Sequence, residues 1–206
     1  MGEERLPLFP LKVVLFPGSS LPLHIFEERY KVLIGESIDG QQEFGISLLL
    51  EKDIAQVGCT AMVSEVVRRF EDGRLDIVVR GKRRFRLQRC EHEGAPYLVG
   101  WVEFLPPSAD EPDRTLAGDT IHLYNKLVSI VYRGNVQQLQ EDFHRQDISF
   151  LLAQKSGMDL VQRQTLLELQ SENERLHLVH QYLQDVIPKL ERREEIERVV
   201  RGDGYL

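Results

Sequence analysis

The chain has 206 residues, an apolar fraction of 42% and a formal net charge of −7. This length allows one large or two small domains with a core, and no apolar run approaches the ~18 residues that a bilayer span needs. The negative charge argues against a dedicated nucleic-acid binder. Two cysteines supply neither a disulfide framework nor a four-ligand zinc set. Acidic residues and prolines at the start are unlike a secretory signal, so a cytoplasmic protein is expected.

Prolines dominate the beginning of the chain, with four of the nine in the first 22 residues. Each fixes its own φ, lacks an N–H and favours extended geometry before it, so no helix is expected before Pro22. The apolar run 13–16 predicts a short buried strand. Pro17-Gly18 then predicts a turn. Beyond Pro22 the period becomes helical, with an apolar stripe of Phe26, Tyr30, Leu33 and Ile34.

Strand patterns continue to about residue 105. Residues 59–70 alternate loosely and residues 75–79 alternate cleanly, with Asp72-Gly73 between them as a two-residue hairpin turn. Residues 84–87 alternate arginine with apolar side chains, which predicts a half-buried strand with its arginines outside. One more strand is expected over 97–105. The proline-rich and acidic segment 106–113 is the expected linker.

The remainder of the chain has helical patterns. An apolar stripe runs from Ile121 to Val131 and is expected to end at Gly134, and Asp147 is a candidate cap for a short helix.

Leucines at 169, 176, 183 and 190 are seven residues apart, as in a leucine zipper with Asn173 and His180 at partner positions. Against this, Ser171-x-x-Glu174 is a capping box that would begin a helix after Leu169. Pro188 also interrupts the pattern. Packing inside an intramolecular bundle is therefore favoured over a two-stranded coiled coil.

The segments LPLFPL, VLFPG and LPLHIFEERY within residues 6–30 resemble the start of the Lon protease amino-terminal, substrate-binding domain family. The resemblance continues in the same order through 44–46, 57–61, 72–74 and 81–87, and then at 164–176. It implies an α+β fold: a PUA-like β-pseudobarrel with one helix over residues 1–107, followed by a helical bundle over 108–206.

The same resemblance implies a non-catalytic domain that binds unfolded polypeptide or a protein partner. It covers only the first domain of a Lon protease, so a stand-alone protein without the ATPase and peptidase modules is expected. The candidate binding residues lie in the first helix: Phe26, Glu27, Glu28, Arg29 and Tyr30.

No catalytic motif accompanies this resemblance. A phosphate-binding loop that contains Gly81-Lys82 would need Gly at position 76 and Ser or Thr at position 83. The chain has Asp76 and Arg83 there, so the loop motif is not present. No nucleophile elbow is present. We therefore expect no enzymatic activity and no cofactor. The oligomeric state is left open, with a monomer favoured.

The alternative function is an RNA- or anion-binding module. Nine basic and three acidic residues between 68 and 89 give this segment a charge of +6, which leaves −13 on the rest. The candidate anion-binding residues are Arg80, Lys82, Arg83, Arg84 and Arg86. Neighbours in a strand point to opposite faces, so a solvated hairpin surface is the favoured interpretation. An adaptor that recruits a partner through the helical half is a further alternative.

Metal binding is not favoured. His177 and His180, with Glu174 one turn earlier, could share a helix face, but zinc would need a further ligand and ordered partners. A structural histidine explains His180. Cys59 and Cys90 are expected to be small core residues.

Overall fold

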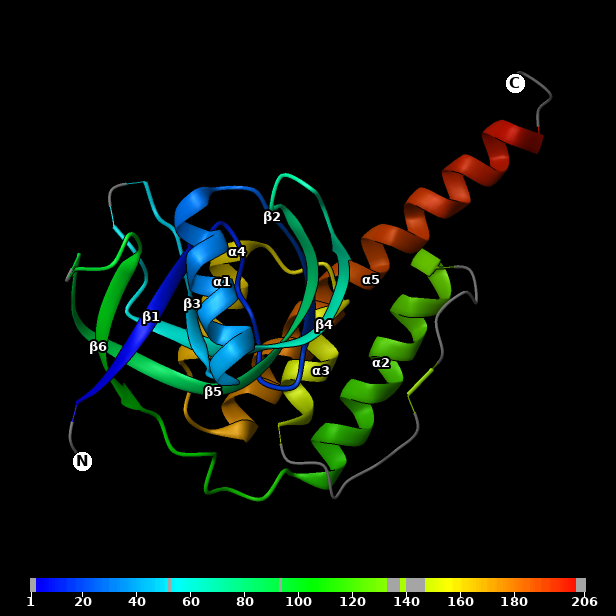
Figure 1. Cartoon of the computed structure of the whole chain (residues 1–206). Helices are drawn as coiled ribbons and strands as arrows, with labels where there is room; N and C mark the ends of the chain where they lie inside the picture. The colour runs from blue at the N-terminus through cyan, green and yellow to red at the C-terminus, as the bar shows by residue number, and fades with distance from the viewer. Residues whose placement is uncertain (1–2, 52, 93, 133–137, 140–146, 203–206) are drawn as a thin grey trace. The chain divides into compact units, whose positions relative to one another are not determined.

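The computed structural model describes residues 3–51, 53–92, 94–132, 138–139 and 147–202 (Figure 1). The elements in chain order are β1 (Glu4–Leu11), β2 (Ser20–Ile25), α1 (Glu28–Gly40), β3 (Phe44–Leu48), β4 (Val57–Arg69), β5 (Leu75–Glu91), β6 (Leu98–Phe104), α2 (Arg114–Tyr132), α3 (Ile148–Gln154), α4 (Leu160–Glu168) and α5 (Glu172–Gly202). They form two compact units, 1–107 with 159–168 and 108–158 with 169–206.

The first unit is built on a six-stranded mixed sheet that closes into a ring. The strand order is β2-β5-β4-β3-β1-β6, and β5 also pairs with β6. Among the described strand pairs, only β1 and β3 run parallel to each other. The predicted α+β class is confirmed: a pseudobarrel with one early helix, and a helical part after it.

β1 accommodates Pro7 and Pro10 although it lies between two strands. Its first half, 4–8, pairs with β6, and its second half, 8–11, pairs with β3. Each half is therefore hydrogen-bonded along one side only, where a residue that lacks an N–H is tolerated. Leu6 and Leu8 enter one core cluster and Phe9 enters another, and Leu8 is fully buried.

The predicted strand at 13–16 is wrong, although its last three residues are buried. The segment bends onto β5 through the predicted turn, where Gly18 has φ +74°. Two backbone hydrogen bonds join this turn to Gly81 of β5. The Gly18 N–H donates to the Gly81 carbonyl, and the Gly81 N–H donates to the Ser19 carbonyl, both at 2.9 Å. A Cβ on Gly81 would lie 2.2 Å from the Phe16 carbonyl oxygen, so only glycine permits this contact.

The helical pattern that follows Pro22 starts later than predicted. Residues 20–25 form β2, paired antiparallel with β5, and α1 begins at Glu28. Phe26 therefore lies outside the helix and is 60% exposed. The buried face of α1 consists of Tyr30, Leu33, Ile34 and Ser37.

The predicted hairpin at Asp72-Gly73 is present but has a longer loop. The Gly73 N–H donates to the Phe70 carbonyl, and the Phe70 N–H donates to the Arg74 carbonyl, both at 3.0 Å. Gly73 has φ +82°. Residues 71–73 thus form a three-residue loop. Its last residue, Gly73, has the left-handed conformation that is usual for the bulge position of such loops.

Helix α4 belongs to the first unit, whereas the sequence division places residues 159–168 with the helical part. Two side-chain bonds attach it. Gln164 Nε2 donates to the Val57 carbonyl, and Arg84 Nη1 donates to the Leu167 carbonyl, both at 3.0 Å. Arg84 is 5% exposed, so the expectation that it lies on the outer face of its strand is wrong.

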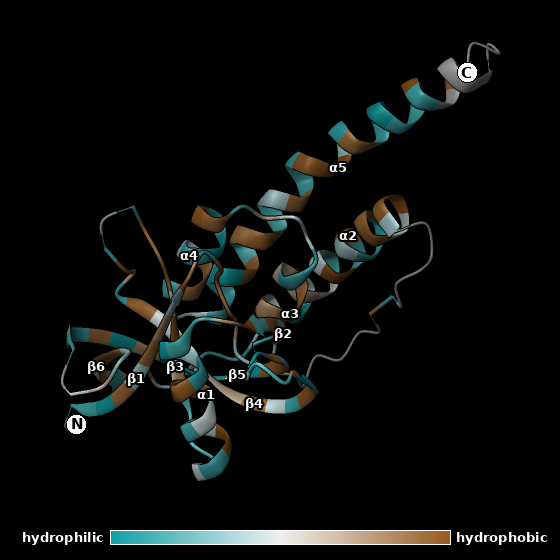
Figure 2. Ribbon diagram, turned by 45° about the horizontal axis from the view of Figure 1, so that its top comes forward, coloured by the Kyte–Doolittle hydropathy of each residue, from teal (hydrophilic) through white to brown (hydrophobic). Residues whose placement is uncertain are grey.

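The second unit contains α2, α3 and α5. The stripe of α2 is buried as far as Val128, but Val131 is 47% exposed, and Gly134 lies outside the described residues. Asp147 precedes α3 without a side-chain cap bond; its carboxylate instead accepts a bond from Arg175 at 2.5 Å. Along α5, hydrophobic and hydrophilic stretches alternate (Figure 2).

Helix α5 follows the capping-box interpretation. It begins after Ser171, whose hydroxyl accepts the Glu174 N–H at 3.2 Å, so Leu169 lies outside it. Its apolar residues Leu176, Val179, Leu183 and Ile187 are buried. The fully buried Arg175 holds the start of the helix by donating to Glu172 and to the Leu169 and Gln170 carbonyls.

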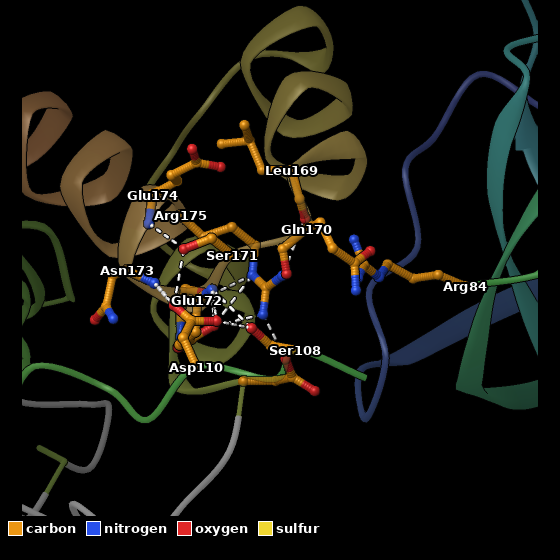
Figure 3. A network of polar contacts seen from close by, with 12 residues as sticks. Arg84, Ser108, Asp110, Leu169, Gln170, Ser171, Glu172, Asn173, Glu174 and Arg175 are labelled. Carbon is orange, nitrogen blue, oxygen red and sulfur yellow. Dashed lines mark hydrogen bonds and ion pairs between the residues drawn. The ribbon is translucent and has the colours of Figure 1, made fainter. Parts of the chain in front are cut away.

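The segment expected to be a linker caps this helix. Figure 3 shows Ser108 and Asp110 directed toward the first turn of α5. The Asp110 carboxylate accepts the Ser171 hydroxyl at 2.8 Å and the Glu172 and Asn173 N–H groups at 3.0 Å. Burial alone would raise the pKa of Asp110, but these bonds and one from Ser108 favour the anion and hold the pKa well below its usual range.

We expect Asp110→Ala to lower the free energy of unfolding by about 1–2 kcal/mol at neutral pH, the usual effect of losing a helix N-cap side chain. Because the pKa is depressed in the folded state, the carboxylate stabilises the fold above its unfolded pKa of about 3.9, and this contribution is lost as pH falls below that value. Urea unfolding of both proteins at several pH values measures the difference. Glu111→Gln, an exposed carboxylate on the same segment, should change little; an equal effect would contradict the cap.

Candidate functional site

An exposed aromatic cluster lies where β2 ends and the β4–β5 hairpin turns. The ring of His24 stacks on Phe26 with centroids 6.0 Å apart and meets Phe70 edge-on at 5.9 Å. The antiparallel register pairs His24 with Asp76, which brings these distant segments together. His24 Nδ1 lies 2.6 Å from the Asp76 carboxylate, and this contact fixes the imidazole beside both rings.

Two arginines complete this cluster. The guanidinium groups of Arg68 and Arg74 lie 4.5 and 5.0 Å from the Phe70 ring centroid. Arg74 also pairs with Asp72 at 2.7 Å. We call His24, Phe26, Phe70, Arg68 and Arg74 the aromatic patch. It offers one largely exposed ring beside cationic hydrogen-bond donors.

The structure separates the predicted first-helix residues into exposed and core positions. Phe26, Glu27, Glu28 and Arg29 are exposed, and Arg29 pairs with Glu27 at 2.8 Å. Tyr30 is buried: its ring stacks on Phe9 with centroids 3.9 Å apart, and burial is the main reason that its pKa is raised. Tyr30 is therefore unavailable to a ligand. Among the exposed residues, Glu28 also has a partner, because its carboxylate pairs with Lys31 at 2.8 Å.

The predicted anion-binding residues do not form one surface. Arg84 is buried against α4, and Arg83 pairs with Glu43 at 3.1 Å while its guanidinium covers the Phe104 ring at 3.7 Å. The exposed members are Arg80, Lys82, Arg83 and Arg86, of which Arg83 is held by its pair with Glu43.

A hollow of about 370 Å³ lies beside α1 and β4. Its walls are five consecutive residues of β4, 62–66, together with Ser37 and Ile38 of α1 and Gln41 directly after that helix. Gln41 ends the helix in a left-handed conformation with φ 50°. No motif in the sequence pointed to this hollow, because it depends on how α1 packs beside the strand.

The candidate metal ligands Glu174, His177 and His180 do not form a metal-binding cluster. Within the part of the chain that the structure describes, no three His, Cys, Asp or Glu residues cluster as a metal site. His180 lies 3.2 Å from the Thr120 hydroxyl, as a structural histidine. Cys59 is a core residue, and burial raises the pKa of its thiol to about 12. Cys90 is exposed, so its predicted core position is wrong.

Among the described helices, none combines the length and the apolar character needed to cross a bilayer.

Residues 5–185 match the model of the ATP-dependent protease La (LON) substrate-binding domain. The chain belongs to this family. It is 24% identical to a Lon protease of Flavobacterium johnsoniae over 96% of its own length and 26% of that protease. The chain thus spans about a quarter of the curated relatives it matches.

Two solved structures are also similar. The Lon N-terminal domain protein from Xanthomonas campestris has a TM-score of 0.65 and 28% identity, covering 84% of this chain and 95% of that one. The N-terminal domain of Mycobacterium avium complex Lon protease has a TM-score of 0.67 and 20% identity, covering 88% and 99%. The second likeness shows the fold alone.

The contrast between Phe26 and Tyr30 predicts opposite effects of truncation. Tyr30→Ala should lower the free energy of unfolding by about 3 kcal/mol or more, since it removes a buried ring and its stacking on Phe9. Phe26→Ala should change it by no more than about 0.5 kcal/mol, as at other exposed positions. Denaturant unfolding followed by circular dichroism compares them. Equal losses would show that Phe26 is also a core residue.

Proposed function

We propose that the chain binds polypeptide without catalysing a reaction, and that the aromatic patch is a contact surface. Membership of the LON substrate-binding domain family supports the class of function. The observation that carries the choice of surface is Phe26, a large ring that is 60% exposed. Covering the part of this side chain that is still exposed is worth about 1–2 kcal/mol. An apolar ligand segment would therefore gain most at this position.

The chemistry around Phe26 suits an unfolded chain. The rings offer flat apolar contact, and the patch arginines donate hydrogen bonds that carbonyl or carboxylate groups can accept. These contacts do not depend on one ligand sequence. A single patch of this size supports micromolar or weaker affinity, about −8 kcal/mol or less favourable.

Deletion of the exposed ring tests the proposal. Phe26→Ala should weaken binding of reduced, carboxymethylated α-lactalbumin about tenfold, as expected for one side chain's worth of buried apolar surface. Native α-lactalbumin should bind less well than the unfolded form. Fluorescence anisotropy with labelled probe measures both.

Two variants control this experiment. Phe26→Tyr keeps the aromatic ring and should retain binding. Val161→Ala removes an exposed apolar side chain from α4, at 74% exposure, and should change nothing. Equal binding of native and unfolded α-lactalbumin, or no binding of either, would contradict the proposed function.

The RNA alternative makes a different prediction. Lys82→Glu with Arg86→Glu reverses two exposed charges without touching the buried Arg84. Polypeptide binding should be unchanged, and any RNA binding should be weak and lost at physiological salt, because few phosphates are contacted and the rest of the chain is acidic. Sub-micromolar RNA affinity at that salt concentration, abolished by this double variant, would make RNA the ligand.

A further inference from the structure

Strand β4 has a long edge without a strand beside it. β4 pairs with β5 from Val57 to Arg69, but its pairing with β3 is confined to 59–61. From Met62 to Arg69 no other described strand pairs with it. An unpaired strand edge presents backbone N–H and C=O groups, which is the template that an added strand uses.

The hollow beside α1 lies along the first part of this edge. It is lined by residues 62–66 in succession, so both the backbone and the alternating side chains of the strand contribute to it. Ile38, Val63 and Val66 are only partly buried there and pack against the core. Glu65 is exposed at the same place. The hollow can therefore receive an apolar side chain of a ligand whose backbone lies against β4.

The edge also leads to the aromatic patch. The strand runs from the hollow at 62–66 through Val67 to Arg68 and Phe70. At about 3.3 Å per residue, these positions span about 25 Å, the length of a segment of roughly eight extended residues. One ligand segment can thus contact the hollow and the aromatic patch together.

We propose that an extended polypeptide segment adds to the sheet along residues 62–69 of β4, with an apolar side chain in the hollow. This inference rests on the proposed polypeptide-binding function and specifies how the segment is held. Backbone pairing is independent of ligand sequence, while the hollow favours an apolar residue at alternate positions. The apolar lining and Glu65 disfavour a nucleic-acid strand at the same edge.

The irregularity of this edge limits how tightly a segment is held. The β4–β5 register shifts between Val63 and Glu65 and again between Val66 and Arg68, so Ser64 and Val67 are bulged. Bulges turn an edge away from indiscriminate pairing with other chains. A short, weakly held segment is therefore favoured over a permanent additional strand. The free edge of β2 contains Pro22, which cannot donate to an added strand.

Hydrogen–deuterium exchange of the intact wild-type chain tests the inference without a substitution. Saturation with reduced, carboxymethylated α-lactalbumin should slow exchange of edge amides in 62–69 by at least about tenfold, because each new hydrogen bond must open before exchange. Amides of 98–104 in β6, which pairs with both β1 and β5, should not change. Binding with unaltered exchange at 62–69 would overturn the edge inference but leave the proposed function standing. Failure of the wild type to bind the unfolded probe would contradict both.

A substitution at the bulge provides a second test. Val67 is 58% exposed and has no register partner on β5, a position where proline is tolerated. Val67→Pro removes a backbone N–H at a residue that has no register partner on β5, and should weaken binding by about fivefold, the worth of one hydrogen bond. Val67→Thr keeps the N–H and the branched shape and should bind normally. Equal affinities for the two folded variants would overturn the inference.

Discussion

The first unit depends on β5 pairing with three strands. Its first part lies between β2 and β4, and its last part pairs with β6 and closes the ring. The change of partners occurs around Gly81, where the absence of a side chain lets the 16–19 turn lie against the strand. Both candidate binding features follow from this geometry. The hairpin reaches beyond the ring, so its tip carries the aromatic patch and β4 has an edge that β3 does not cover.

Polar groups in the second unit are held by equally specific bonds. Arg175 is fully buried, but its guanidinium donates to Asp147, Glu172 and two backbone carbonyls. A buried charge without such partners would be strongly destabilising. The same region uses Asp110 to satisfy the first N–H groups of α5. Charged side chains thus determine where α5 begins, while its apolar residues determine what it packs against.

Local chemistry made several of these features predictable. The Ser171 capping box located the start of α5, and Asp72-Gly73 located the β4–β5 hairpin, because both signals act over three or four residues. The family resemblance indicated the α+β fold and drew attention to Phe26. The exposed position of Phe26 was not evident, since helical spacing alone suggested that it belonged to the buried stripe.

The errors came from contacts between distant residues. A strand at 13–16 was expected from its apolar composition, but hydrogen bonds with Gly81 bend the segment instead. Arg84 was expected to face solvent from strand alternation, but the Leu167 carbonyl of a helix far along the chain receives it. The aromatic patch likewise needs the register that places His24 opposite Asp76. None of these partners lies within the reach of a local pattern.

The position of α4 has a consequence for how the chain folds during synthesis. Residues 159–168 join the first unit only after the whole of 108–158 has emerged, so the barrel cannot complete its contacts when its last strand is made. Until then, the Arg84 guanidinium lacks the Leu167 carbonyl and the Val57 carbonyl lacks Gln164. Closing such long loops carries an entropic cost that slows folding. The first unit is therefore discontinuous in sequence. A truncation after residue 107 removes α4 from the first unit along with the whole of the second unit.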